Sequence, residues 1–201
     1  MATTKLVKKQ LRKDMATLLG AIPKEEIEKQ TACVVKQIKS APWLKSAARV
    51  GVYVSTVGEI ETDGLVEHLL DHGKQVFIPQ FRKGDKRMRF LPLSRAEWPG
   101  TLSSTLWGIR QHPTDDGIER PGYEETGALD VLLMPGVAFS KELDRLGHGA
   151  GFFDSFLKEH KERFGRFPLR VGISLREQII PTVPVSEFDV PIEHLIYPKE
   201  E

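Results

Sequence analysis

The apolar residues in the first part of the chain recur at the spacing of α-helices. A first stripe is formed by Leu6, Leu11, Met15 and Leu18 or Leu19, within residues 4–20. A second stripe is formed by Ile27, Thr31, Val34, Val35 and Ile38. Gly20 ends the first segment, Pro23 stands at about the first position of the second, and Pro42 stops it. We therefore predict two amphipathic helices at the start of the chain.

After residue 48 the pattern changes to runs typical of strands. Arg49–Ser55 and Gln75–Pro79 are such runs, and between them Thr62 caps a helical pattern that continues to about His72. A strand, a helix and a strand in this order predict a parallel pair joined by a right-handed crossover. Further strands are expected at Phe90–Leu93, Leu129–Met134 and Leu169–Ser174, with an edge strand at Ile192–Tyr197.

Residues 94–128 are rich in Pro, Gly and Thr and show little periodicity. We expect a long, partly ordered connection there, which in a compact domain is often functional. A helix is expected from about Phe152 to Phe164. The whole pattern predicts a single domain over residues 1–201 of the α/β class. Its architecture would be three-layer α/β/α and Rossmann-like, with a mostly parallel, mixed sheet.

The composition is that of an ordinary globular domain. Of 201 residues, 40% are hydrophobic and 28% charged, which excludes a wholly disordered chain, a collagen-like fibre and a disulfide scaffold. Lys plus Arg (29) and Asp plus Glu (28) leave a net charge of +1, which argues against a dedicated nucleic-acid binder. Cys33 is the only cysteine, so no internal disulfide forms. No apolar run approaches a membrane span, and we expect a cytoplasmic protein without membrane partners.

The most informative segment is RLGHGAGFFD, from Arg145 to Asp154. Glycines alternate at 147, 149 and 151 just before the predicted helix, so backbone N–H groups could converge on phosphate oxygens beside the positive helix end. Arg145 and His148 add donors. The spacing is neither a Walker A motif nor the dinucleotide fingerprint. An ordinary flexible loop, in which Asp154 merely stabilises the first helical turn, is an equally open interpretation.

Carboxylates and cations elsewhere could complete a phosphate site. Asp154, and Asp189 near the C-terminus, could hold Mg²⁺ with phosphates and water, although each could be only a cap or a solvated charge. Lys8 and Arg12 are four apart and share one side of a helix, so they could clamp a polyphosphate or simply face solvent. A second basic cluster could hold a polyanionic tail or be a solvated loop; it consists of Arg82, Lys83, Lys86, Arg87 and Arg89.

Other residues could contact an organic ligand. Glu59 and Glu61 follow the first strand and could accept hydrogen bonds from a substrate's N–H groups, or Glu61 could belong to a helix cap. Trp107 and Tyr123 lie in the long connection, where a flat ligand would stack or where they would anchor the loop. The histidines lack an HExxH context, so zinc is not expected.

These residues resemble a known family. RLGHGAGFFD, preceded by LDVLLMPGVAFS, is similar to the signature of the 5-formyltetrahydrofolate cyclo-ligase family, also called 5,10-methenyltetrahydrofolate synthetase. Lys8–Arg12 resembles its N-terminal Lys-x-x-Leu-Arg, and Glu59–Thr62 its Glu-Ile-x-Thr segment. Phe77–Pro79 resembles its strand ending in Pro, and Trp107–Pro113 its Trp-x-Ile-x-x-Pro region with a spacing one longer. The resemblance covers nearly the whole chain, and the glycine loop is its most specific part.

The resemblance implies a carbon–nitrogen ligase of folate one-carbon metabolism that depends on ATP and Mg²⁺. It would convert 5-formyltetrahydrofolate to 5,10-methenyltetrahydrofolate and release ADP and phosphate. Phosphorylation of the formyl oxygen would be followed by ring closure through nitrogen 10, and catalysis would rest on positioning and charge neutralisation. The substrates would be small molecules, with no nucleic-acid partner, and the enzyme a monomer.

The resemblance also implies roles for individual residues. The ATP-binding residues would be Lys8, Lys9, Arg12, Arg145, Leu146, Gly147, His148, Gly149, Ala150, Gly151, Phe152 and Phe153. Of these, Arg145 and His148 would be catalytic. The folate would be bound by Val54, Glu59, Trp107 and Phe152, and Mg²⁺ by Asp154 and Asp189. The basic cluster from Arg82 to Arg89 could hold a polyglutamate tail, by its charge.

The chain also departs from the family pattern. Members commonly carry a basic residue where Ala150 stands, often Arg at His148, and Tyr at Phe152 or Phe153. Because the chain lacks that basic residue, a non-catalytic module that binds folate or a nucleotide on the same scaffold is an alternative hypothesis. A sugar-phosphate isomerase or acyl transferase on a similar scaffold is a further one, since fold does not determine function.

Overall fold

The computed structural model describes residues 2–85, 87–104 and 108–199, and its centre is a six-stranded sheet with the order β10-β9-β6-β1-β2-β3. These strands are β1 (Arg49–Val52), β2 (Gln75–Phe81), β3 (Met88–Leu93), β6 (Val131–Met134), β9 (Leu169–Ile173) and β10 (His194–Ile196). All neighbours are parallel except β2 and β3, which are antiparallel. The predicted mixed, mostly parallel sheet is confirmed, and β10 is the predicted edge strand.

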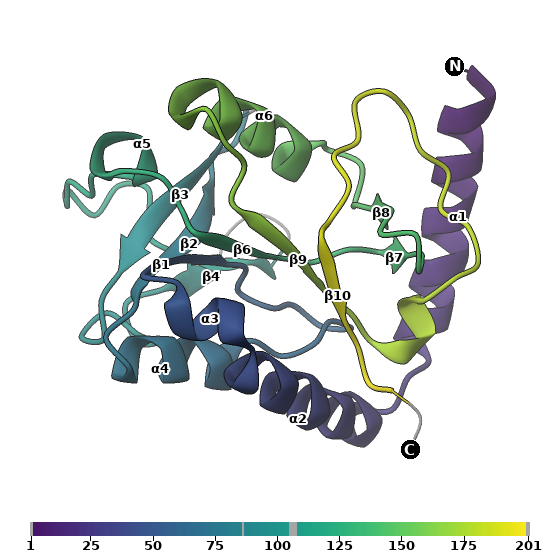
Figure 1. Ribbon diagram of the computed structural model, residues 1–201, viewed down its shortest axis with the longest axis horizontal. Coiled ribbons are helices and arrows are strands. Elements are labelled where there is room, and N and C mark those ends of the chain that lie inside the picture. The colour runs from purple at the N-terminus through teal and green to yellow at the C-terminus, as the bar shows by residue number, and fades with distance from the viewer. Residues whose placement is uncertain (1, 86, 105–107, 200–201) are drawn as a thin grey trace.

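Helices cover both faces of this sheet (Figure 1). One face carries α2 (Lys24–Ser40), α3 (Pro42–Ser46) and α4 (Asp63–Asp71), and the other carries α5 (Tyr123–Thr126) and α6 (Phe152–Phe164). The chain leaves β1 through α4 to β2 on one side, and leaves β6 through α6 to β9 in the opposite direction. Because such crossovers are right-handed, opposite directions put the two helices on opposite faces. The predicted three-layer α/β/α fold is therefore confirmed.

Each face of the sheet has its own apolar core. Val50, Val52 and Val131 point to the face covered by α2 and α4, where they cluster with Val34 and Leu65. Phe77, Leu132 and Met134 belong to the opposite cluster, together with Phe156 and Leu157 of α6. Neighbouring residues of one strand thus supply different cores, as the twofold period of a strand requires.

The first helix, α1 (Ala2–Gly20), stands beside the sheet rather than over it (Figure 1). It packs on a small hairpin formed by β7 (Ala138–Phe139) and β8 (Arg145–Leu146). Met15 of α1, Ala138 and Leu146 form the centre of a third apolar cluster. This packing brings α1 next to the segment that follows β8, which is the glycine-rich loop.

Three of the local details that differ from the sequence-based expectations lie at the ends of elements. Pro23 lies at the N-cap of α2 and not at its first position. The first strand ends at Val52 instead of Ser55. Thr62 makes no capping hydrogen bond to α4, because its hydroxyl donates to Tyr53 O (2.8 Å) and accepts from Ser55 N (3.0 Å). Thr62 therefore links the end of the loop that follows β1 to its beginning.

The long connection contains more structure than its composition indicates. A second small hairpin pairs β4 (Ser103–Ser104) with β5 (Arg110–Gln111), and α5 follows before β6 begins. A 3-10 turn, η2 (Arg176–Gln178), follows β9. The part between β3 and α5 returns along the end of β2, where Gln111 and His112 are both fully buried.

Candidate functional site

A cavity of about 420 Å³ lies at the carboxyl ends of the central strands. Tyr53 and Val54 follow β1, Pro79 and Phe81 end β2, and Pro135 follows β6, and all five line the cavity. The remaining lining residues are Thr56, Glu59, Ile109, His148, Ala150, Phe152 and Phe153. In open α/β sheets the ligand crevice forms where the strand order reverses, and here the chain turns from the β2 side to the β6 side of β1.

Glu59 provides the cavity with a carboxylate. Its Oε2 accepts hydrogen bonds from the backbone N (2.8 Å) and the hydroxyl (3.1 Å) of Thr56, while Oε1 lies 3.7 Å from Nε2 of His148. Nearby, the Tyr53 hydroxyl donates to Ile60 O (3.1 Å). Burial, and secondarily the Glu59 charge, raise the pKa of Tyr53 well above its usual value. The cavity is thus mainly apolar, with one held carboxylate that can accept ligand N–H groups.

The glycine loop borders the cavity and leads into α6. Gly149 (φ 108°) and Gly151 (φ 73°) both have left-handed backbone angles, which strain other residues. A Cβ added at Gly149 would also lie 3.3 Å from Cζ of Arg12. Gly151 is the N-cap of α6, so the loop delivers its backbone to the positive end of that helix. The predicted loop and helix are confirmed.

The basic face of α1 meets this loop from the other side. Arg12 Nε donates to Gly147 O (2.7 Å), and Lys8 forms an ion pair with Asp189. Asp189 Oδ2 also accepts from the backbone N (2.6 Å) and hydroxyl (2.8 Å) of Ser186. Burial alone would raise the pKa of Asp189, but the hydrogen bonds from Lys8 and Ser186 outweigh it and lower the pKa. Burial lowers the pKa of Arg12, and the Asp189 charge partly offsets this.

Arg145 and Asp154 connect the loop to α6. The Arg145 side chain is only 3% exposed and donates to Asp154 Oδ2 (3.0 Å) and to Pro135 O (3.4 Å). Its guanidinium carbon lies 5.6 Å from the ring centroid of Phe153. Asp154 Oδ1 accepts from Val190 N (3.0 Å), the residue after Asp189, so the two predicted metal ligands belong to neighbouring segments. Within the described part of the chain, the buried Arg145 Nε has no hydrogen-bond partner.

The structure brings most of the predicted site residues into one region. Val54, Glu59, His148, Ala150, Phe152 and Phe153 line the cavity, while Lys8, Arg12, Arg145, Asp154 and Asp189 lie at or behind the glycine loop. Lys9 is exposed on α1. The Leu146 side chain is buried against α1, so this residue can offer a ligand only its backbone. Trp107 lies outside the described residues, and its predicted role stays a prediction.

Six lining residues were not predicted as site residues: Tyr53, Thr56, Pro79, Phe81, Ile109 and Pro135. For Tyr53, Phe81 and Pro135 the available signal was their position at the end of a strand or directly after it. By contrast, the idea that a ligand stacks on Tyr123 is wrong, because that ring is 1% exposed and packs on Phe156 and His160. Glu61 is exposed and lines a neighbouring groove rather than the cavity.

The second basic cluster is divided in the structure. Arg87 pairs with Glu159, and Arg89 pairs with Glu124 and Glu125. Arg82 and Lys83 are exposed directly after Phe81, at the rim of the cavity wall. Lys86 lies outside the described residues. Among the described residues of this cluster, it is therefore chiefly Arg82 and Lys83 that remain available to bind a polyglutamate tail.

The described residues lack two further features. They contain no group of three or more His, Cys, Asp or Glu side chains arranged to hold a metal ion. Within the same residues, no helix has the length and apolar character needed to cross a membrane.

Comparison with known proteins gives a consistent result. The family model described as the 5-formyltetrahydrofolate cyclo-ligase family matches residues 4–198. A Caenorhabditis elegans protein named "Probable 5-formyltetrahydrofolate cyclo-ligase" is 45% identical over 100% of this chain and 97% of its own length. The mouse 5-formyltetrahydrofolate cyclo-ligase is 28% identical, covering 97% of this chain and 95% of its own.

A solved structure agrees with the sequence relatives. The NMR structure of Aquifex aeolicus 5,10-methenyltetrahydrofolate synthetase superposes with a TM-score of 0.74 and 26% identity, covering 94% of this chain and 89% of that chain. The sequence matches, the shared fold and the glycine-loop site point to one enzyme class. The chain belongs to the 5-formyltetrahydrofolate cyclo-ligase family of carbon–nitrogen ligases.

Proposed function

We propose that the enzyme uses ATP and Mg²⁺ to close the ring of 5-formyltetrahydrofolate, giving 5,10-methenyltetrahydrofolate, ADP and phosphate. One observation carries this proposal: the glycine loop separates two unlike environments. On one side, His148, Ala150 and Phe152 line the apolar cavity with Glu59. On the other, Arg12 contacts the loop at Gly147. A folate ring and a polyphosphate would therefore meet across this loop.

The basic side of the loop suits a polyphosphate. Lys8 and Arg12 stand on one face of α1, and Arg145 lies behind the loop with a buried Nε that lacks a protein partner among the described residues. Guanidinium groups and backbone N–H groups at a helix start are the usual donors to phosphate oxygens. An arriving phosphate would compete with Asp189 for Lys8. The charges needed to neutralise ATP are therefore present at the loop.

The acidic residues suit one Mg²⁺ ion that takes most of its ligands from phosphates. Mg²⁺ commonly binds one or two protein carboxylates together with phosphates and water. The hydrogen bonds of Asp189 to Lys8 and Ser186 all reach Oδ2, and Asp154 is bonded to Arg145 and to Val190 N. We infer that these two residues would hold the ion, which when bound would neutralise negative charge on the phosphates.

The reaction itself needs no nucleophile from the protein. A formamide oxygen leaves poorly, so the formyl oxygen first attacks the γ-phosphorus and the bond to ADP breaks. Nitrogen 10 then attacks the formyl carbon and loses its proton, and the carbon–oxygen bond breaks to release phosphate. The chain's task is to align the two substrates and to oppose the moving negative charge, as in other phosphoryl transfers. Arg145 and His148 would act on the transferred phosphate.

The cavity residues would hold and orient the folate. Glu59 would accept N–H groups of the reduced pterin, and Val54 and Phe152 would cover its ring. The apolar lining would keep water from the phosphorylated intermediate, which hydrolysis would otherwise destroy. Trp107 would stack on the folate, as the family resemblance implies.

Location and assembly belong to the same proposal. We expect a cytoplasmic enzyme, because a chain with one cysteine fits a reducing compartment. We expect a monomer, because residues of one chain line the cavity on every side that the structure describes. Sedimentation of the purified enzyme tests the second point, and dimers at the concentrations used in assays would contradict it.

An absorbance assay at the methenyltetrahydrofolate band tests the reaction. The purified enzyme receives 5-formyltetrahydrofolate and Mg²⁺ with and without ATP, and we expect product only with ATP. Asp154→Asn should reduce the rate steeply, because it removes a charged carboxylate that would hold Mg²⁺ beside the phosphates. Asp130→Asn is the matched control, since Asp130 also binds backbone N–H groups and an arginine but precedes β6 at the opposite end of the sheet.

The other outcomes identify the alternatives. Folate binding by calorimetry without turnover would support a non-catalytic binding module. Absence of both turnover and folate binding would direct attention to sugar phosphates. Full activity after removal of divalent metal would contradict the assigned role of Asp154 and Asp189.

A further inference from the structure

The cavity wall opposite the glycine loop is held by a buried side-chain amide. Phe81 and Ile109 belong to this wall, and Gln111 follows Ile109 by two positions. The Gln111 side chain is fully buried, and its Oε1 accepts from Phe81 N (2.9 Å) while its Nε2 donates to Phe81 O (2.8 Å). One amide therefore satisfies both main-chain polar groups of a residue that lines the cavity.

This pairing replaces a missing strand. On the β1 side of β2 the last register pair is Gly51 with Phe77, because β1 ends at Val52. β2 continues to Phe81, which is 7% exposed. Its N–H and C=O would be buried without partners if nothing took the place of β1, and buried unpaired backbone groups are costly. The Gln111 amide supplies the donor and acceptor that the next strand would have given.

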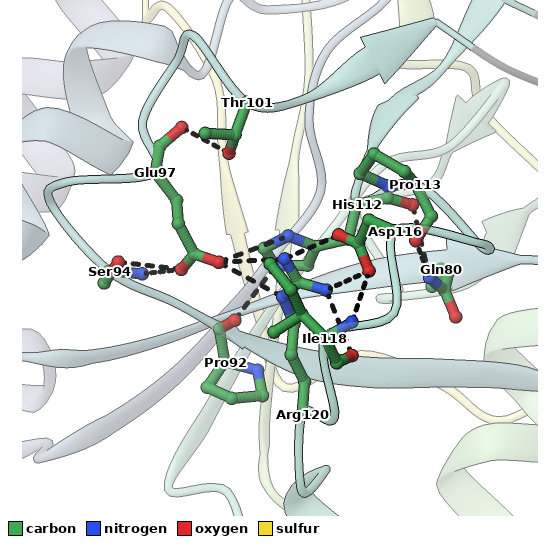
Figure 2. A network of polar contacts seen from close by, with 10 residues as sticks. All are labelled: Gln80, Pro92, Ser94, Glu97, Thr101, His112, Pro113, Asp116, Ile118 and Arg120. Atoms are coloured by element: carbon green, nitrogen blue, oxygen red, sulfur yellow. Dashed lines mark hydrogen bonds and ion pairs between the residues drawn. The ribbon is translucent and has the colours of Figure 1, made fainter.

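Neighbouring polar contacts fasten the same segment (Figure 2). Gln80 Nε2 donates to His112 O (3.2 Å) and Pro113 O (3.4 Å), and the His112 ring donates through Nε2 to Pro92 O (2.9 Å). Glu97 and Asp116 both pair with Arg120 and close the loop around His112. The segment that carries Ile109 and Gln111 is thereby tied to both β2 and β3.

We propose that Gln111 is a positioning residue for the folate substrate, because its amide sets the backbone of Phe81 and thereby the place of the Phe81 ring in the cavity wall. This inference rests on the proposed function, in which the cavity receives the folate. Phe81 also contacts Phe152 of the glycine-loop helix edge to face, with ring centroids 5.0 Å apart. Gln111 therefore shapes the folate side of the site from a position that lines no part of the cavity.

The substitution Gln111→Met tests the inference, since it keeps the length of the side chain and removes both hydrogen bonds. We expect the KM for 5-formyltetrahydrofolate to rise by about ten-fold or more, because a displaced Phe81 ring would lose binding contact with the folate. The KM for ATP should change by less than about two-fold, since no contact of Gln111 reaches the loop's basic side. Hydrogen exchange at the Phe81 amide should become faster in the same variant.

Gln30→Met is the matched control. Gln30 is also a buried glutamine, and its Oε1 accepts from the backbone N of Arg176 (2.8 Å), but it lies on α2 away from the cavity. We expect it to lose thermal stability to a similar extent while both KM values stay at the wild-type level. A loss of stability alone would then not explain the result for Gln111→Met.

A double-mutant cycle with Phe81→Leu asks whether Gln111 acts through that ring. If it does, Gln111→Met should add little to the folate KM once the ring is gone. Should Gln111→Met fail to fold, Gln111→Asn takes its place, because the shorter side chain keeps an amide that reaches only part of the pair. An intermediate rise in folate KM is expected there.

Several results would overturn the inference. Folded Gln111 variants with an unchanged folate KM would do so, as would equal rises in the KM values for folate and ATP. Failure of the proposed function is separate: wild-type enzyme without cyclo-ligase turnover would contradict that function whatever the variants do. An active wild-type enzyme with unaffected Gln111 variants would contradict only the positioning role.

Discussion

Two walls of the same cavity are held in different ways. The glycine-loop wall is held by charged groups, and some of them remain partly accessible. The clearest case is the Lys8–Asp189 pair, whose side chains are 12% and 25% exposed. The opposite wall is held by neutral, fully buried groups, namely the Gln111 amide and the His112 ring. Both walls lie at the carboxyl ends of the strands. They differ in the kind of interaction that holds them in place.

The contrast indicates which wall can change on ligand binding. A lysine paired with aspartate can exchange that partner for a phosphate at little cost, since both partners are charged acceptors for it. A buried amide has no such exchange available, because breaking its two bonds leaves backbone groups unsatisfied. We therefore expect the nucleotide side to rearrange and the folate side to be preformed. The following variants break or sharpen this comparison, in order of decreasing effect.

Arg145→Lys should have the largest effect. The guanidinium reaches Asp154 and Pro135 O at once, and a lysine cannot reproduce this fork although it keeps the charge. We expect kcat to fall by about 100-fold, the usual consequence of losing a donor that opposes transition-state charge. Steady-state kinetics with both substrates measures this. Activity near the wild-type level would mean that the charge of Arg145 suffices without its geometry.

Lys8→Met should change the KM for one substrate only. Removing one charged hydrogen bond to phosphate is expected to raise the KM for ATP by about ten-fold, while the folate KM stays constant. Comparison with Lys13→Met, an exposed residue of the same helix, controls for the general charge of the helix. Equal effects of the two variants would show that the basic face attracts ATP only through its long-range field.

As the pH falls, the wall that contains Gln111 and His112 should lose stability before the carboxylates of the other wall are protonated. Burial, and secondarily the Arg120 charge, lower the pKa of His112 in the folded protein. The unfolded chain therefore binds more protons once the pH falls below about 6.5, and the free energy of unfolding decreases by up to about 1.4 kcal/mol per pH unit for each such histidine. The loss continues until the pH reaches the folded pKa.

Urea unfolding between pH 7.5 and 5.5 measures this slope. His160 contributes in the same direction, since burial lowers its pKa and its Nε2 accepts from Leu129 N (3.0 Å). His112→Gln should therefore reduce the slope without abolishing it. An unchanged slope in His112→Gln would show that the ring is not held neutral by its surroundings.

Ala150→Lys should have the smallest effect. The residue is exposed and lines the cavity at the glycine loop, so a lysine there adds a charge near the phosphates. We expect the KM for ATP to fall by about two- to five-fold, the range of an exposed ion pair. An unchanged or raised KM would mean that Lys8, Arg12 and Arg145 already neutralise the nucleotide.

Sequence patterns could predict the glycine-loop wall because its signals are local. Alternating glycines before a helix, and cations four apart on α1, are visible within short windows. That Lys8 meets Asp189 required the packing of α1 on the β7–β8 hairpin, which no local period encodes. The family resemblance implied a nucleotide role for Lys8 and a Mg²⁺ role for Asp189, but it did not predict their contact.

The opposite wall was largely hidden from the sequence. Gln111 lies in a stretch without periodicity, and its role depends on where β1 ends relative to β2. Thr62 was expected to cap a helix because its residue type favours caps, yet the loop after β1 uses its hydroxyl. Strand ends at Tyr53, Phe81 and Pro135 converge only through parallel pairing of distant segments. Such convergence is a property of the topology rather than of any one motif.

The contact between Lys8 and Asp189 joins residues 181 positions apart. During translation, the lysine emerges among the first residues and its partner only after nearly the whole domain has been made. A ribosome-bound chain that stops before residue 189 therefore lacks one of the two carboxylates that we propose for holding Mg²⁺ beside the nucleotide. Nucleotide capture should begin only late in synthesis, so prematurely terminated chains would not compete for ATP.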